Sequence, residues 1–301
     1  MPRRLAVVDM GSNTLKFSVT EVEDSGAERI LHSHAETVRL GAGVAITGAL
    51  EPNRIERALL ALRHYEIVAR FYAVEACIGV ATAALRTATN GDDLLEEIHR
   101  TTGWSVRVIS GDEEARLAFV GLASSLPDEQ DSLLVDIGGG STELIHVSGG
   151  AVSASESLDM GSGSLADRCF QSDPPGVTAV SDALVHAGDA LTGSTVLPQL
   201  TSPVLVFSGG NGQFLKAFAE WTDIAIPFEP GRFRELLSTM ADVHSTRLAG
   251  YLNIVPERAR MLPAGGAIAM AVINRTSPRS IQAAPSGIRG GLVANWLAAQ
   301  P

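Results

Sequence analysis

The chain alternates between short apolar runs and longer segments whose apolar residues recur at helical spacing. The run at 5–8 has the length of a buried strand, and apolar residues alternate with polar ones over 16–22, as in a strand with one polar face. The segment 51–71 predicts a long amphipathic helix. Its apolar positions near helical spacing are Ile55, Leu59, Leu62 and Ile67.

Predicted strands and helices alternate along most of the chain, which is typical of α/β sheets covered by helices on their faces. Strands are predicted at residues 5–8, 16–22, 30–40, 76–81, 106–109, 133–136, 144–147, 151–157, 204–207 and 280–284. Helices are predicted at 51–71, 92–100, 111–124, 162–170, 177–191, 233–240, 245–252, 267–273 and 287–299, with a further helix starting at 213.

One local pattern, a strand that ends in an acid and a glycine turn, occurs twice. It is present in Val135–Glu143 and again in Val8–Leu15, so that Asp136 and Asp9 lie 127 positions apart. A chain of 301 residues has room for about two domains. The repeat and the length together predict a duplicated domain.

The second copy could bind an anion. Three consecutive glycines, Gly138 to Gly140, let backbone N–H groups converge on a phosphate, and the carboxylates of Asp136 and Glu143 could hold a hard cation against it. A glycine-rich turn without function explains one such loop equally well. The copy at Asp9 favours phosphate binding, because two such loops on duplicated domains would face each other across a cleft.

Glu114 is a third candidate carboxylate, in the first turn of the helix predicted at 111–124. Acids are favoured in a first turn by the helix dipole alone, so their presence needs no function. However, Glu114 shares a helix face with Leu117 and Ala118. A carboxylate on that apolar side could deprotonate a water molecule.

Composition and charge narrow the classes of function. Hydrophobic residues make up 45% and charged residues 19%, as in an ordinary soluble globular protein. The longest nearly apolar stretch, 262–273, is shorter than the roughly 20 residues of a membrane span. The start of the chain lacks the apolar region of a secretory signal, so we expect a cytoplasmic protein without a membrane partner. A net charge of −11 argues against nucleic acid as a partner.

Histidines and cysteines offer no stronger site. His32 and His34 share one face of a predicted strand without a third ligand nearby, so we expect ordinary strand residues. Cys77 and Cys169 have no metal-ligand spacing and are expected to be buried free thiols. Of 23 basic residues only Lys16 and Lys216 are lysines, and base composition explains that bias as well as phosphate binding does.

Four segments together resemble the exopolyphosphatase and guanosine pentaphosphate phosphohydrolase family. They occur in the family's order and spacing, and the resemblance is close from residue 5 to about residue 165. The segments are Ala6–Thr14, Ala81–Asn90, Val108–Leu117 and Val135–Glu143. The resemblance implies two duplicated actin-like (ribonuclease H-like) domains of the sugar kinase, Hsp70 and actin superfamily with a cleft between them. It also implies Mg²⁺-dependent release of terminal phosphate, with Mn²⁺ as an alternative ion.

The resemblance also implies roles for individual residues. Glu114 would be the base that activates the attacking water, while Asp136 and Glu143 would orient water and metal, with Asp9 as a further metal ligand. The implied phosphate-binding residues are Gly11, Ser12, Asn13, Arg86, Gly138, Gly139, Gly140 and Ser141. Such groups suit phosphoryl transfer, in which positioning and charge neutralisation supply most of the catalysis.

The predicted substrate is inorganic polyphosphate, in short chains, because this chain lacks the C-terminal helical region of long family members. Guanosine pentaphosphate is the alternative substrate, and a kinase or a non-catalytic sensor of the same superfamily would be a different function. We expect the first domain at 1–127 and the second at 128–287, and leave open whether the terminal helix 288–301 joins the first. An exposed domain edge is compatible with a homodimer. The segment Gly209-Gly210-Asn211 differs from the family's usual Gly-Gly-Thr, to unknown effect.

Overall fold

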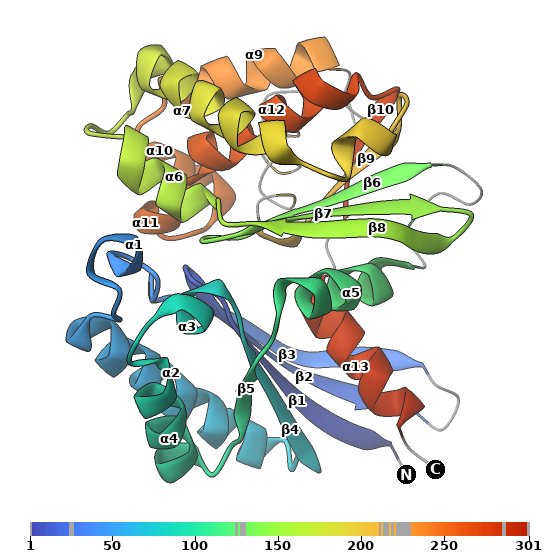
Figure 1. Ribbon diagram of the computed structural model, residues 1–301. Coiled ribbons are helices and arrows are strands. Elements are labelled where there is room, and N and C mark those ends of the chain that lie inside the picture. Colours follow the sequence, from blue (N-terminus) through green and yellow to red (C-terminus); the bar gives the residue numbers. More distant parts are fainter. Residues whose placement is uncertain are drawn as a thin grey trace.

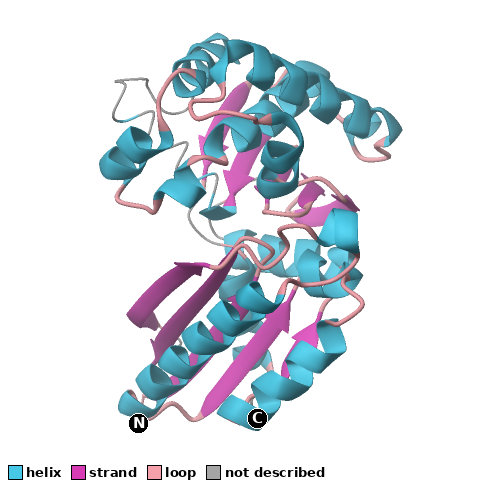
Figure 2. Cartoon of the chain, turned by 90° about the vertical axis from the view of Figure 1, so that its left-hand side faces the viewer, coloured by secondary structure: helices cyan, strands magenta, loops and turns pink. Residues whose placement is uncertain are grey.

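The computed structural model describes residues 2–23, 27–123, 131–210, 230–284 and 287–299, together with the single residues 126, 212, 217 and 220. Two mixed five-stranded sheets form the centres of two domains that stack along the long axis of the molecule (Figure 1). Helices cover both faces of each sheet, as Figure 2 shows from the side.

The first sheet has the strand order β3-β2-β1-β4-β5. Its strands are β1 (Arg3–Met10), β2 (Thr14–Val22), β3 (Glu28–Thr37), β4 (Ala76–Ala81) and β5 (Val106–Val108). The first three strands form an antiparallel meander, and β4 and β5 add to β1 in parallel.

The second sheet repeats this order as β8-β7-β6-β9-β10. Its strands are β6 (Ser132–Ile137), β7 (Thr142–Ser148), β8 (Ala151–Leu158), β9 (Val204–Ser208) and β10 (Ser280–Ala283). Again the first three strands are antiparallel and the last two parallel to the first. The duplication and the expected two-domain α/β fold are confirmed.

The helices of the first domain form two layers. They are α1 (Val44–Thr47), α2 (Pro52–Phe71), α3 (Ala83–Thr87), α4 (Gly91–Thr102), α5 (Gly111–Leu122) and the terminal α13 (Ile288–Ala298). Side chains of β1 alternate between the layers: Ala6, Val8 and Met10 pack with α2, whereas Leu5 and Val7 pack with α13. A strand buried on both faces therefore appears as a continuous apolar run.

Helix α13 answers the question left open by the sequence, because it packs on α5 and β1 of the first domain. Gly121 and Gly291 permit this close approach: a Cβ on Gly291 would lie 2.1 Å from the carbonyl oxygen of Leu117. β1 begins and α13 ends on the side of the first domain away from the second (Figure 1). The boundary predicted between residues 127 and 128 lies outside the described residues.

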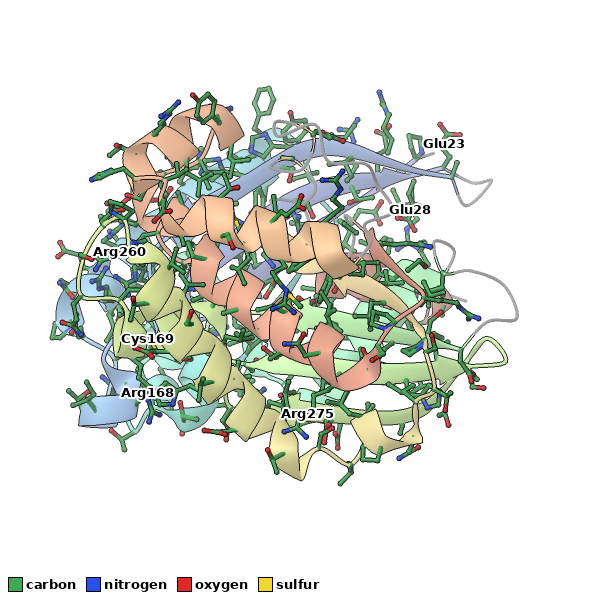
Figure 3. The ribbon with its side chains drawn as sticks, turned by 90° about the horizontal axis from the view of Figure 1, so that it is seen from above. Glu23, Glu28, Arg168, Cys169, Arg260 and Arg275 are labelled. Carbon is green, nitrogen blue, oxygen red and sulfur yellow. The ribbon has the colours of Figure 1, made fainter. Side chains whose placement is uncertain are left out.

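The helices of the second domain cover the outer face of its sheet. They are α6 (Ser162–Cys169), α7 (Gly176–Ala190), α9 (Pro230–Ala241), α10 (Ser245–Leu252), α11 (Pro256–Ala259) and α12 (Leu262–Thr276). Arg275, at the end of α12, donates to the carbonyl of Gly188 on α7 at 3.0 Å, which ties these two helices together (Figure 3). The other face of the sheet packs on Ala115, Ala118 and Leu122 of α5, so α5 lies between the two sheets.

Most predicted elements agree with the structure within two or three residues, and the exceptions have local causes. The short helices α1, α3 and α11 were not predicted, because four or five residues carry too little periodicity. Ile67 was expected on the buried face of α2 but is 64% exposed, while Ala58, Ala61 and Tyr65 face the core instead.

The remaining expectations concern single residues and segments. Cys77 and Cys169 are free thiols, as predicted, but both are only partly buried where burial was predicted. His32 lies on β3 in ring contact with Phe17 and Tyr72, as expected of an ordinary strand residue. Asn211 lies outside the described residues, as does most of the helix that was predicted to start at residue 213. Within the described residues, no helix has both the length and the apolar character needed to cross a membrane.

Candidate active site

Two hairpin turns of the same form meet in the cleft between the domains. The N–H of Gly11 donates to the carbonyl of Thr14 at 3.2 Å, and the N–H of Gly138 donates to the carbonyl of Ser141 at 2.9 Å. The turns line one pocket of about 70 Å³. The predicted phosphate-loop residues in its lining are Gly11, Ser12, Asn13, Gly138, Gly139, Gly140 and Ser141. The structure thus brings both predicted loops together, as a phosphate held from two sides would require.

An aspartate is the second-last residue of the strand before each turn, but its partner on the next strand differs between the domains. Asp9 pairs in register with Lys16, whose Nζ lies 3.4 Å from the Asp9 Oδ2. Asp136 pairs in register with Glu143 instead. The first hairpin is therefore charge-neutral at this position, whereas the second carries two acids.

Glu114 comes to the same pocket from the first turn of α5. The hydroxyl of Ser110 caps this helix by accepting from the backbone N–H of Glu113, which fixes the turn that carries Glu114. The Glu114 side chain is 6% exposed, and Arg86 donates to its Oε2 at 3.2 Å. The expected position of Glu114 on the buried side of the helix is confirmed.

The two adjacent glutamates of α5 have opposite electrostatic environments. Burial, and then the charge of Asp9, raises the pKa of Glu114 to about 7, although Arg86 opposes this rise. Glu113 is bonded to Arg107, which holds the pKa of Glu113 below its usual value. Of these two glutamates, Glu114 is the one whose pKa lies close to neutral pH, where a general base works best.

The two carboxylates of the second hairpin are almost completely buried. Burial, more than any other cause, raises the pKa of Asp136, and the charge of Asp9 adds to the rise. Burial raises the pKa of Glu143 well above its usual value, with further rises from Glu114 and Asp136. The Ser157 hydroxyl on β8 donates to the Glu143 Oε1 at 2.9 Å and so orients this carboxylate.

This donor set suits a hard divalent cation, since the pocket gathers four buried carboxylates, those of Asp9, Glu114, Asp136 and Glu143. Among the described residues no three His, Cys, Asp or Glu side chains lie close enough to hold an ion alone. Mg²⁺ typically binds one or two carboxylates and takes its other ligands from water and substrate phosphates. An ion here would therefore be bound by one or two of these four carboxylates and would take further ligands from substrate phosphates.

Arg86 lies in the short helix α3, and its Nη1 also donates to the carbonyl of Ile109 at 2.7 Å. Arg86 is not one of the described residues that line the pocket of about 70 Å³. Its contacts therefore hold Glu114 and the start of α5, and its predicted phosphate contact remains a prediction.

A cationic pocket of about 260 Å³ adjoins the first, and sequence reasoning missed it. It is lined by Lys16, by Arg258 of α11 and by Arg289 of α13. Burial, together with the charge of Arg289, lowers the pKa of Arg258 to about 10. Two partly buried guanidinium groups that repel each other favour a polyanion beside them.

The sequence held one signal for this pocket. The sequence repeat extends through the second strand of each hairpin, where Lys16 corresponds in position to Glu143. Arg258 and Arg289 come from far along the chain, and no spacing rule connects them. Gly210 also lines both pockets, while a Cβ on Gly209 would lie 2.4 Å from the Asp136 Oδ1, which explains a glycine there.

Comparison with solved structures agrees with this fold. A Ppx/GppA family member of Aquifex aeolicus is 26% identical, with a TM-score of 0.76 over 99% of this chain and 98% of that one. A structure described as an exopolyphosphatase from Cytophaga hutchinsonii superposes with a TM-score of 0.87 over 99% of both chains, at 22% identity, and so supports the fold alone.

Sequence comparison identifies the family. Over 191 residues the chain is 38% identical to "Exopolyphosphatase 2" of Mycobacterium tuberculosis, a match that covers 60% of this chain and 59% of the relative. The match therefore spans somewhat more than half the length of that curated relative. A model of the Ppx/GppA phosphatase family matches residues 18–300. The chain belongs to the Ppx/GppA phosphatase family.

Proposed function

We propose that the protein is an exopolyphosphatase that hydrolyses the terminal phosphoanhydride bond of short inorganic polyphosphates. The observation that carries the proposal is Glu114, a buried carboxylate with a pKa of about 7 beside a pocket between two glycine loops. A pocket of about 70 Å³ suits one phosphoryl group, and the adjoining cationic pocket suits the rest of a polyanion.

Binding places the terminal phosphoryl group between the two turns, where backbone N–H groups of Gly139, Gly140 and Ser141 stabilise its oxygens. Lys16, Arg258 and Arg289 hold the following phosphates in the cationic pocket. The bridging oxygen is thereby directed toward Lys16, which favours negative charge on the leaving chain.

In the reaction, Glu114 accepts a proton from a water molecule as the water oxygen bonds to the terminal phosphorus. The bridging P–O bond breaks, and its electron pair leaves with the shortened chain, giving orthophosphate. Arg86 keeps Glu114 pointed at the pocket and favours its ionised form. Mg²⁺, held in part by Asp136 and Glu143, would neutralise phosphate charge when bound.

The test is a comparison of substrates with Mg²⁺: tripolyphosphate, longer polyphosphates, guanosine pentaphosphate and ATP with and without an acceptor. We expect orthophosphate from tripolyphosphate at the highest kcat/KM, and release slowed by about 10²–10⁴-fold in Glu114→Gln. Preferential hydrolysis of guanosine pentaphosphate would reassign the substrate. Phosphate transfer from ATP to an acceptor, without release from polyphosphate, would overturn the proposal.

A further inference from the structure

The pocket of about 70 Å³ between the two turns, called the reaction pocket from here on, borders two larger pockets whose linings differ in charge. On one side it shares Asp9, Lys16 and Arg258 with the cationic pocket of about 260 Å³. On the other side it borders a wide pocket of about 980 Å³, and the residues common to these two are Ser12, Asn13, Gly139 and Gly140. Among the described lining residues, the two outer pockets have none in common.

The border with the wide pocket is a closely packed wall. A Cβ on Gly139 would lie 2.4 Å from the Cγ of Asn13, and one on Gly163 would lie 2.6 Å from the Asn13 Oδ1. A Cβ on Gly140 would lie 2.6 Å from the Ser12 Oγ. The side chains of Ser12 and Asn13 therefore fill notches that only glycine leaves open, and they lie where the two pockets border each other.

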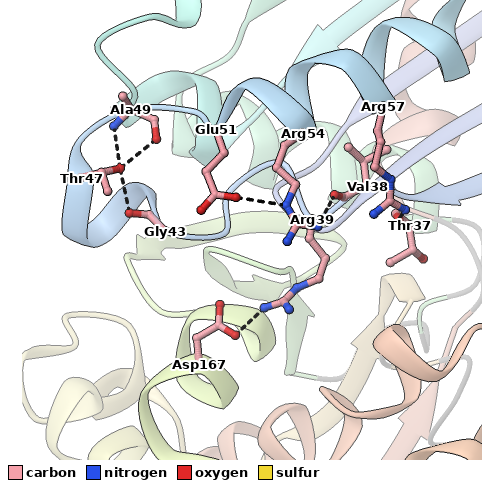
Figure 4. Close-up of polar contacts among 10 residues, drawn as sticks. All are labelled: Thr37, Val38, Arg39, Gly43, Thr47, Ala49, Glu51, Arg54, Arg57 and Asp167. Atoms are coloured by element: carbon pink, nitrogen blue, oxygen red, sulfur yellow. Dashed lines mark hydrogen bonds and ion pairs between the residues drawn. The ribbon is translucent and has the colours of Figure 1, made fainter.

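Backbone contacts hold this wall from behind. The N–H of Gly41 donates to the carbonyl of Ser12 at 2.7 Å, and the N–H of Arg39 donates to the carbonyl of Asn13 at 2.8 Å. The guanidinium of Arg39 crosses the cleft to pair with Asp167 on α6 (Figure 4). The wall is thus braced by both domains.

The charges of the lining residues also differ between the wide pocket and the cationic pocket. The wide pocket is lined by three carboxylates, those of Asp159, Asp167 and Asp189, against the guanidinium of Arg168 and the ring of His186. Because Arg39 pairs with Asp167, the acids exceed the nearby guanidinium groups by one. The cationic pocket on the other side has Lys16 and two arginines against the two carboxylates of Asp9 and Asp136, so its lining keeps a net positive charge. A polyanion is therefore attracted from one side of the reaction pocket and repelled from the other.

We propose that Ser12 and Asn13 form a chain-end stop that restricts cleavage to the last phosphate of the chain. This inference rests on the proposed function and deepens it. A polyphosphate enters through the cationic pocket, its terminal phosphoryl group meets Ser12 and Asn13, and no further phosphate can pass. Internal bonds never reach Glu114, so each turnover releases one orthophosphate.

Binding tests the stop independently of turnover. In the Glu114→Gln background, Kd is measured with Mg²⁺ for tripolyphosphate and for tripolyphosphate carrying an alkyl ester on both ends. We expect the capped chain to bind at least about tenfold more weakly, because either cap would meet the wall. Adding Asn13→Gly should reduce that ratio to within about threefold, because the notch beside Gly139 opens.

Ser12→Gly opens the same wall from the Gly140 side and serves as the second variant, with thermal unfolding checked for both. Equal binding of capped and free chains before the wall is opened would overturn the stop. So would an unchanged ratio in a folded Asn13→Gly or Ser12→Gly protein. Orthophosphate release from free tripolyphosphate by the unaltered protein tests the proposed function separately, so the two failures are distinguishable.

Discussion

The two hairpins of the active site have the same backbone and different chemistry. Each closes with a glycine N–H bonded to the carbonyl three residues later, and each follows an aspartate. Yet Asp9 pairs with Lys16, whereas Asp136 pairs with Glu143. In the proposed reaction, the shared turn would form a two-sided phosphate cradle, and the charge exchange between Lys16 and Glu143 would divide the work. The first hairpin would supply a cation for the leaving chain, and the second would supply carboxylates for metal and water.

Removing the acid of the second hairpin should break this division most severely. We expect Glu143→Gln to lower kcat for tripolyphosphate by about 10²–10³-fold, as loss of a preorganised electrostatic group does. Mn²⁺ binding followed by electron paramagnetic resonance should weaken in parallel. If Glu143→Gln kept both its turnover and its Mn²⁺ affinity, the role assigned to the second hairpin would be wrong.

The counterpart change, Lys16→Gln, should have a smaller effect of a different kind. We expect kcat/KM to fall about tenfold, because one charge-assisted phosphate contact is lost while the base and carboxylates remain. Mn²⁺ affinity should not weaken, since a neighbouring positive charge is removed. Steady-state kinetics as a function of chain length would check this, and a loss of Mn²⁺ binding would contradict it.

The pH profile of kcat/KM should rise through about pH 7, because Glu114 must be deprotonated to accept a proton and its pKa is about 7. Arg86 lowers that pKa. Arg86→Gln should therefore move the acidic limb to higher pH by up to about one unit. A limb that stayed in place, or moved to lower pH, would show that another group controls the profile.

Stability should show the smallest effect, with the opposite sign from activity. The folded pKa of Glu114 lies above its usual value of 4.5, so the unfolded chain ionises first as pH rises and stability falls between about pH 4.5 and 7. Glu114→Gln should therefore raise the free energy of unfolding at pH 8 by on the order of 1–3 kcal/mol and change it little at pH 4. Denaturant unfolding at both pH values would measure it. An equal gain at both would point to packing instead of charge.

The sequence predicted the fold well because the physical signals were local and repeated. Apolar runs bounded by glycine turns located the strands, and the Asp-glycine repeat revealed the duplication. The short helix α3 that carries Arg86 was missed, since five residues give no periodicity. The predicted burial of Ile67 in α2 was wrong, because alanines and Tyr65 face the core where larger aliphatic residues were expected.

The site was predictable where each hairpin carries its own residues, and not where distant segments converge. Gly11 to Asn13 and Gly138 to Ser141 lie within single turns. Arg258 and Arg289 reach the cationic pocket from α11 and α13, and only tertiary packing brings them beside Lys16. Ser157 of β8 contacts Glu143 of the neighbouring strand β7, because the antiparallel pairing of these strands places the two residues opposite each other.

The central claim is that Glu114 drives a water molecule onto a phosphoryl group held between the two hairpins. Its most direct test is the single-turnover rate of orthophosphate release from tripolyphosphate with Mg²⁺ at pH 8. Glu114→Gln should slow release by about 10²–10⁴-fold. Glu113→Gln, which changes the adjacent side chain bonded to Arg107, should remain near the unaltered rate. Full release by Glu114→Gln, or an equal loss in both variants, would contradict the account.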